Sequence, residues 1–197
     1  MRFSKAAACA LLSSAFVFSQ PAMANGNLRA EAVIGWDQVA QGINAQTLNV
    51  TYPDKVNGVA YGGAIGYDLP VAPILTIGAD VEIGGSTGRY SFGDTYFRVG
   101  RDLYTGGRVS LRVLPSTRIY AKLGYANGNF TNHQSLLWTR GQVITNDSDS
   151  KVSGIRAGIG VQQTIFGPAY VMAEYRYTHY NLAFTRNQVV TGVGVRF

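Results

Sequence analysis

Apolar side chains alternate with small or polar side chains along eight segments of the chain. In the third segment, Val81 and Ile83 flank the charged Glu82, and the same period of two runs through the neighbouring residues. This period sends neighbouring side chains to opposite faces of a β-strand. The eight predicted strands are Leu28–Asp37, Gly58–Leu69, Ile74–Gly84, Leu103–Leu114, Arg118–Asn127, Gly154–Thr164, Tyr170–Tyr180 and Gln188–Phe197.

The connections between these segments are alternately short and long. An even number of strands, joined by short turns on one side of a membrane and long loops on the other, is expected of an outer-membrane barrel. The pattern therefore predicts an all-β fold, an eight-stranded antiparallel up-and-down transmembrane β-barrel. The short connections span residues 68–73, 115–117 and 166–169, and the long ones span roughly 38–57, 85–102, 128–152 and 181–187.

The polar face of the predicted strands combines large ionic side chains with many glycines and alanines. A narrow lumen accounts for this combination, because long side chains fill the space beside residues that lack one. The alternative, a soluble barrel, places the apolar face inside and the charges in water. We assign the apolar face to lipid, since aromatic residues near the strand ends are typical of membrane-interface girdles. These aromatic residues are Trp36, Tyr61, Tyr67, Tyr125, Tyr175, Tyr177 and Phe197.

Twelve charged residues on the polar face are the main candidate functional side chains. An eight-stranded barrel has an interior just filled by side chains, and buried charges require partners. We therefore expect an ion-pair network that closes the lumen; the alternative is an anion-preferring path lined by the same residues. The predicted network consists of Arg29, Glu31, Asp80, Glu82, Arg108, Arg112, Arg118, Lys122, Arg156, Glu174, Arg176 and Arg196.

The first 24 residues have the three parts of a secretory signal peptide. A basic start is followed by an apolar run over residues 6–18 and by the cleavage site Ala22-Met23-Ala24. The apolar run is shorter than the about 20 residues that a membrane-spanning helix needs. We expect export through a Sec-type signal peptide, 1–24, followed by one β-barrel domain, 25–197.

Cleavage changes the chemistry available to the mature chain. The only cysteine, Cys9, is lost, which excludes disulfides and cysteine-based metal sites from the barrel. Loss of Arg2 and Lys5 lowers the formal net charge from +6 to +4. The remaining arginines are spread through the alternating segments, so nucleic-acid binding is not expected.

The end of the chain resembles the small outer-membrane β-barrel proteins of Gram-negative bacteria, the OmpA/OmpX-like or porin-family group. The carriers of the resemblance are Gly192-Val193-Gly194-Val195-Arg196-Phe197 and, before it, Ala173-Glu174-Tyr175-Arg176-Tyr177. The resemblance implies a cell outer membrane location among lipid and lipopolysaccharide. It also implies that Phe197 is part of the signal read by the barrel-assembly machinery.

No catalytic or metal-binding constellation is complete. His179 lies in Tyr177-Thr178-His179-Tyr180-Asn181, which resembles the histidine region of a lipid A deacylase, but Asn181 stands where the serine nucleophile is expected. No acidic residue follows Glu174, so a triad lacks its carboxylate as well. His133 is isolated, and Asp147 and Asp149 lack the rest of a calcium-loop pattern. We expect no enzyme activity, no cofactor and no metal.

The third long connection contains an apolar and cationic patch, Leu136, Leu137, Trp138 and Arg140. Such a patch is a candidate contact for a host or phage surface or another protein; the alternative is that it folds onto the barrel rim or anchors in lipopolysaccharide headgroups. The sequence thus predicts a non-enzymatic outer-membrane protein, structural or surface-interacting, with a lumen filled by side chains. Two alternatives stay open: a narrow porin-like channel for small solutes, and an adhesin or phage receptor that acts through its loops.

Overall fold

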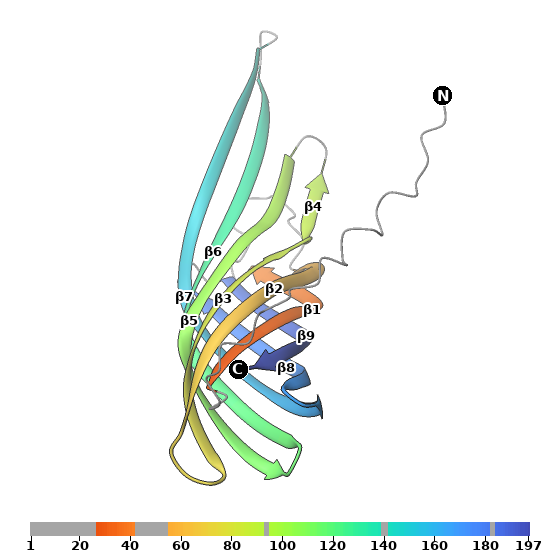
Figure 1. Ribbon diagram of the computed structural model, residues 1–197. Helices are drawn as coiled ribbons and strands as arrows, with labels where there is room; N and C mark the ends of the chain where they lie inside the picture. Colours follow the sequence, from red (N-terminus) through yellow and green to blue (C-terminus); the bar gives the residue numbers. More distant parts are fainter. Residues whose placement is uncertain (1–26, 42–54, 93–94, 139–141, 182–183) are drawn as a thin grey trace, which may run out of the picture.

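The computed structural model describes residues 27–41, 55–92, 95–138, 142–181 and 184–197 (Figure 1). The predicted signal peptide, 1–24, lies outside the described residues. None of the described residues belongs to a helix that is long and apolar enough to cross a membrane. The strands are β1 Leu28–Gln41, β2 Lys55–Pro70, β3 Leu75–Ser86, β4 Arg89–Phe92, β5 Thr95–Leu114, β6 Thr117–Trp138, β7 Gln142–Phe166, β8 Ala169–Tyr180 and β9 Phe184–Arg196.

The strands form one closed antiparallel barrel. The sheet runs in the order β3-β2-β1-β9-β8-β7-β6-β5-β4, and an additional pairing of β3 with β5 closes it. The first and last barrel strands meet along a full seam, in which Arg29 lies opposite Arg196 and Gln41 lies opposite Phe184. The short strand β4 pairs only with the beginning of β5, beyond the end of β3. Eight strands therefore make the wall, which confirms the predicted fold class.

The period of two separates the two faces of the wall as predicted. Ile65, Val81 and Ile159 are 61–63% exposed on the outer face, whereas Arg29, Arg108 and Arg156 are 1–2% exposed inside the barrel. The predicted aromatic girdle residues Trp36, Tyr61, Tyr67, Tyr125, Tyr175 and Tyr177 are all at least 40% exposed and so face outward. The soluble-barrel alternative, which requires an apolar interior, is wrong.

The two ends of the barrel differ. The end that carries the connections β2–β3, β5–β6 and β7–β8, here named the turn end, has short turns as predicted. Gly167 adopts a φ of 51° in the last of these, a left-handed conformation that favours glycine. The opposite end is named the loop end.

The loop end contains more strand than the sequence predicts. Most of the predicted loop 128–152 is a hairpin, because β6 and β7 stay paired as far as Trp138 and Gln142. Figure 1 shows this hairpin rising well beyond the other strands. The connection 85–102 contains β4 and the first part of β5, and 181–187 shrinks to 181–183 because β9 begins at Phe184. Beyond the membrane both faces of a hairpin meet water, so the apolar alternation that marks a strand is lost. The region 42–54 lies outside the described residues.

Candidate functional site: the ion-paired lumen

The inward faces of all eight wall strands supply charged side chains to the lumen. The cations and carboxylates are equal in number among the described residues, so the charges of the lumen balance. The seven cations are Arg29, Arg108, Lys122, Arg156, Arg176, Arg186 and Arg196, and the seven carboxylates are Glu31, Asp37, Asp68, Asp80, Glu82, Asp102 and Glu174.

The layer nearest the turn end is a square of two arginines and two carboxylates. Arg29 pairs with Glu31 at 2.9 Å and also with Asp80. Arg108 pairs with the same two carboxylates, at 3.2 Å and 2.9 Å. Asp68 forms a further ion pair with Arg29, at 3.2 Å. Each carboxylate therefore compensates two guanidinium groups, which satisfies the demand of a buried ion for several partners.

Glu31 is the most heavily bonded acceptor of this layer. Besides the two arginines, it accepts hydrogen bonds from the Tyr170 hydroxyl at 2.7 Å and from the Gln162 amide at 3.1 Å. The Gln162 carbonyl in turn accepts from Arg196 at 2.6 Å. These bonds connect strands β1, β7, β8 and β9 across the barrel.

The middle layer repeats the arrangement with a lysine in place of one arginine. Lys122 pairs with Glu82 and, at 2.6 Å, with Glu174. Arg176 pairs with the same carboxylates at 3.2 Å and 2.7 Å. The Tyr120 hydroxyl donates a hydrogen bond to Glu174 at 2.6 Å. The guanidinium of Arg108, from the turn-end layer, stacks 4.0 Å from the Tyr120 ring centroid. The layers are therefore in contact along the barrel axis.

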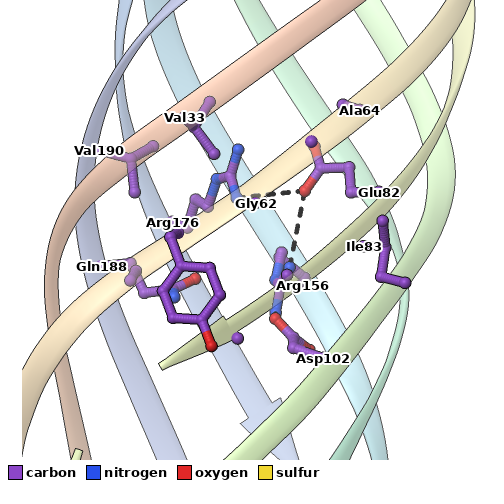
Figure 2. Close-up of a pocket in the computed structure, with 15 residues that line it drawn as sticks. Val33, Gly62, Ala64, Glu82, Ile83, Asp102, Arg156, Arg176, Gln188 and Val190 are labelled. Atoms are coloured by element: carbon purple, nitrogen blue, oxygen red, sulfur yellow. Dashed lines mark hydrogen bonds and ion pairs between the residues drawn. The ribbon is translucent and has the colours of Figure 1, made fainter. Parts of the chain in front are cut away.

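The layer nearest the loop end is built around Asp102. Arg156 pairs with Asp102, and Arg186 lies 3.2 Å from the same carboxylate. Arg186 also donates two hydrogen bonds to Asp37, at 2.7 and 2.9 Å. Arg156 reaches back to Glu82 at 3.7 Å, a contact drawn in Figure 2, and so joins this layer to the middle one.

Glycines on the wall make room for the largest inward side chains. A Cβ atom at Gly194 or Gly160 would overlap the rings of Tyr170 and Tyr120, and one at Gly66 would overlap the Arg29 guanidinium. The interior therefore holds long polar side chains because the opposing strand positions are empty, as expected from the sequence.

A cavity of about 20 Å³ remains between the middle and loop-end layers (Figure 2). Its lining residues include Glu82, Arg176 and Gln188, each of which has one buried polar atom without a hydrogen-bond partner. A void of this size with polar partners holds about one water molecule. It is too small to form a solute path through the network.

Ten of the twelve residues predicted for the network lie in it, and two do not. Arg112 is exposed and Arg118 is partly exposed, and they lie opposite each other where β5 turns into β6. Neither has a carboxylate within ion-pair distance in the described part of the chain. Their inclusion in the network was wrong because the alternation continues to the strand ends, whereas the closed part of the lumen stops one layer earlier and leaves them at a water-accessible mouth.

Four network members were missing from the prediction. Asp102 and Arg186 belong to stretches predicted as loops, 85–102 and 181–187, and only the longer strands of the structure place them inside. Asp37 and Asp68 stand at predicted strand ends, where a charge is as readily explained by solvent. The available signal was their even spacing from inward positions: Asp37 is eight residues from Arg29 and Asp68 is two residues from Gly66, and residues an even number apart share a face of a strand.

The remaining candidates are Phe197, His179 and the patch of the third long connection. Phe197 ends the β9 seam, where its backbone NH donates to the Leu28 carbonyl at 2.9 Å. His179 is exposed on the outer face. Leu136, Leu137 and Trp138 belong to the paired tip of β6, where only the backbone is described, and Arg140 lies outside the described residues.

The described carboxylates of the lumen are all engaged with cations. No group of three or more His, Cys, Asp or Glu side chains in the described segments has the geometry to hold a metal ion.

Three comparisons place the fold among known proteins. A family model, the outer membrane protein beta-barrel domain, matches residues 8–197. The crystal structure of Neisserial surface protein A is similar with a TM-score of 0.59 and 14% identity, over 86% of this chain and 97% of that one. The crystal structure of Ail, the attachment invasion locus protein of Yersinia pestis, gives 0.53 and 15%, over 87% and 99%. At these identities the structures share the fold, and curated protein sequences give no match.

Proposed function

Because this chain belongs to the outer membrane protein β-barrel domain family, and so to the outer membrane of Gram-negative bacteria, we propose that it is a non-enzymatic barrel with a closed lumen that acts through its loop end. Its turn end then faces the periplasm and its loop end the cell exterior. Residues 1–24 direct its export, and the barrel-assembly machinery inserts it.

The observation that carries the closed lumen is the balanced network of ion pairs. Three layers of charges, joined by Arg108–Tyr120 stacking and by the Arg156–Glu82 pair, cross the barrel. A conducting path requires every layer to open, and breaking a buried pair costs about 3–5 kcal/mol. This cost disfavours the narrow channel.

Planar-bilayer recording of the refolded protein tests this part. We expect no discrete conductance steps. A neutral pair of changes in the middle layer, Lys122→Ala with Glu174→Ala, removes bulk without leaving an unpaired charge from that pair and serves as the matched control. Because the layers on either side keep their ion pairs, this variant is also expected to show no conductance steps. Discrete steps from the unmodified protein would instead establish the narrow channel.

The β6–β7 hairpin supports the surface-interacting part. β8 pairs with β7 only from Gly154 onward, so residues 142–153 of β7 extend past the last pairing with β8. At about 3.3 Å per residue, these residues reach roughly 40 Å. An outer edge of this kind offers backbone groups to a strand of a partner. The charged Asp147, Asp149 and Lys151 along it are typical of edges protected from indiscriminate pairing.

Shortening the hairpin tests this role. Replacing residues 129–151 by Asn-Gly keeps the β6–β7 pairing from Gly128 and Val152 downward. We expect an intact, heat-modifiable barrel that no longer supports attachment of whole cells to host cells. The matched control keeps the hairpin and changes only Leu136, Leu137 and Trp138 to serine. It distinguishes a contribution of these three side chains from a contribution of the strand edge. Unchanged attachment of the shortened protein would remove the adhesive role, and lost phage sensitivity alone would make it a phage receptor.

A further inference from the structure

Two exposed arginines on the outer face of β5 have no carboxylate partner among the described residues. Arg98 and Arg101 are exposed. Arg101 stands two residues beyond Leu103, an outward apolar residue of β5. Arg89 lies directly opposite Arg98 in the β4–β5 pairing. Positive charge is therefore concentrated where the apolar band of the barrel ends.

A β-bulge is what turns Arg101 outward. The β5–β6 register shifts between Val99 and Asp102, and both of these residues are buried toward the lumen. In a regular strand residues three apart face opposite sides, so one of the two would have to point outward. The bulge absorbs the extra residue and places Arg98 and Arg101 on the same outer side, and bulges re-aim side chains in this way.

A hollow lies beside these arginines. It has a volume of about 430 Å³ and is lined by the stretch 98–101, by Tyr61 and by the glycine pair Gly84 and Gly85. Gly85 has no side chain, and the Tyr61 ring lies over it, since a Cβ atom there would come within 2.9 Å of the Tyr61 hydroxyl. The hollow thus joins an aromatic ring of the predicted membrane-interface girdle to two guanidinium groups.

An apolar groove continues from this hollow down the lipid-facing wall. It has a volume of about 980 Å³, and Ile83 lines both the groove and the hollow. Its sides include Ile65, Val81 and Leu103, and small residues such as Ala32 and Gly63 form part of its lining. A cationic hollow above an apolar groove matches a molecule with an anionic head and a hydrocarbon tail.

We propose that this surface binds one phosphorylated glycolipid of the outer leaflet, with its phosphate between Arg98 and Arg101 and an acyl chain along Ile83, Val81 and Ile65. The assignment rests on the proposed function only in placing the loop end at the outer leaflet. Planar guanidinium groups bind phosphate oxygens with two parallel hydrogen bonds. A soluble polyanion would use the arginines but leave the groove empty, so the continuity of the two favours a lipid.

The test uses the full mature chain refolded in a neutral detergent, with binding of diphosphorylated lipid A measured by native mass spectrometry. Arg98→Gln with Arg101→Gln is expected to weaken binding by about tenfold or more, because charge-assisted hydrogen bonds to phosphate are about twice as strong as the neutral ones that glutamine can offer. Arg112→Gln with Arg118→Gln removes two arginines at the turn end and is the matched control, with unchanged binding expected. Ala32→Phe fills the groove without changing charge and is expected to weaken lipid binding as well.

Two results would overturn the proposal. One is unchanged lipid A binding by the Arg98→Gln, Arg101→Gln variant. The other is binding of inorganic phosphate or a sulfated sugar as tight as that of lipid A, with no effect of Ala32→Phe, which would establish a soluble polyanion site. Heat-modifiable migration of every variant shows that the barrel is folded. Conductance and cell attachment are measured separately, so failure of the proposed function is distinguished from failure of this site.

Discussion

Individual lumen residues are constrained by charge balance. Six buried cations and the partly buried Arg196 meet seven buried carboxylates, and arginine cannot lose its proton to escape an unpaired position. A change at one acidic residue therefore leaves a full positive charge in the interior. Removing one partner of a buried pair is much more costly than the net contribution of the pair.

Glu31 offers the clearest case, because it accepts from Arg29, Arg108, Gln162 and Tyr170. We expect Glu31→Gln to lower the free energy of unfolding by about 3–5 kcal/mol, measured by urea titration of the refolded protein in lipid vesicles. Arg112→Gln, at the exposed mouth, is expected to change it by less than about 0.5 kcal/mol. Adding Arg108→Gln to Glu31→Gln restores the balance and should recover part of the loss. A loss below about 1 kcal/mol for Glu31→Gln would mean that water reaches this layer.

Glycine positions are constrained by the space that inward side chains occupy. A Cβ atom at Gly194 overlaps the Tyr170 ring, whereas one at Gly107 has its nearest neighbour 3.8 Å away. We expect Gly194→Ala to cost about 1–3 kcal/mol through overpacking, and to disturb the 2.7 Å bond from Tyr170 to Glu31. The same change at Gly107 should be within about 0.5 kcal/mol of neutral. Equal effects in a thermal unfolding series would show that the lumen repacks freely.

Among the elements, the strands inside the membrane were predictable and those outside it were not. Inside the membrane one face of each strand carries outward apolar side chains, such as Ile65, Val81 and Ile159, and the other face carries polar ones. The alternation in the sequence is therefore strong there. Along 131–138 and 142–151 the sequence has no such regular alternation of apolar and polar residues. The bulge at Gly100–Arg101 is a register feature, and register depends on pairing with β6, which no single segment encodes.

The same limits decided which site residues were predicted. Arg29, Glu31 and Arg108 lie within alternating segments and were identified. Asp102 and Arg186 were missed because their strands extend past the apolar band. The partner of each charge was not predictable, since Arg108 and Glu31 are 77 residues apart in the chain and meet only across the lumen.

Strand β9 closes the barrel against β1, and Phe197 follows its last paired residue. The seam includes 13 opposed pairs from Arg29–Arg196 to Gln41–Phe184, so loss of Phe197 removes little of it. We expect deletion of Phe197 to reduce the amount of barrel assembled in the outer membrane, while the unfolding free energy of the refolded protein changes by less than about 1 kcal/mol. Cell fractionation and urea unfolding measure the two quantities. Normal outer-membrane levels would show that Phe197 is not needed for recognition by the assembly machinery.

At the scale of the whole molecule, the charges divide into a neutral interior and a basic exterior. Residues 25–197 carry a net charge of +4, because Arg2 and Lys5 account for the difference from the formal +6 of the chain. The described lumen contributes none of this excess. The excess therefore lies outside the described lumen, and Arg98 and Arg101 beside the hollow contribute to it.

This division predicts that added salt weakens electrostatic interactions at the exterior and leaves the ion pairs of the lumen nearly unchanged. The Debye length, beyond which exposed charges are largely screened from each other, is about 10 Å at 0.1 M salt and about 3 Å at 1 M. Buried pairs are screened much less. Raising sodium chloride from 0.1 to 1 M should thus change the unfolding free energy by less than about 1 kcal/mol. Over the same range, binding of lipid A to the refolded protein should weaken severalfold, and the Arg98→Gln, Arg101→Gln variant should lose most of that dependence. A large loss of stability in salt would place water among the lumen charges, and the interior would then have to be regarded as an ionic path rather than a plug.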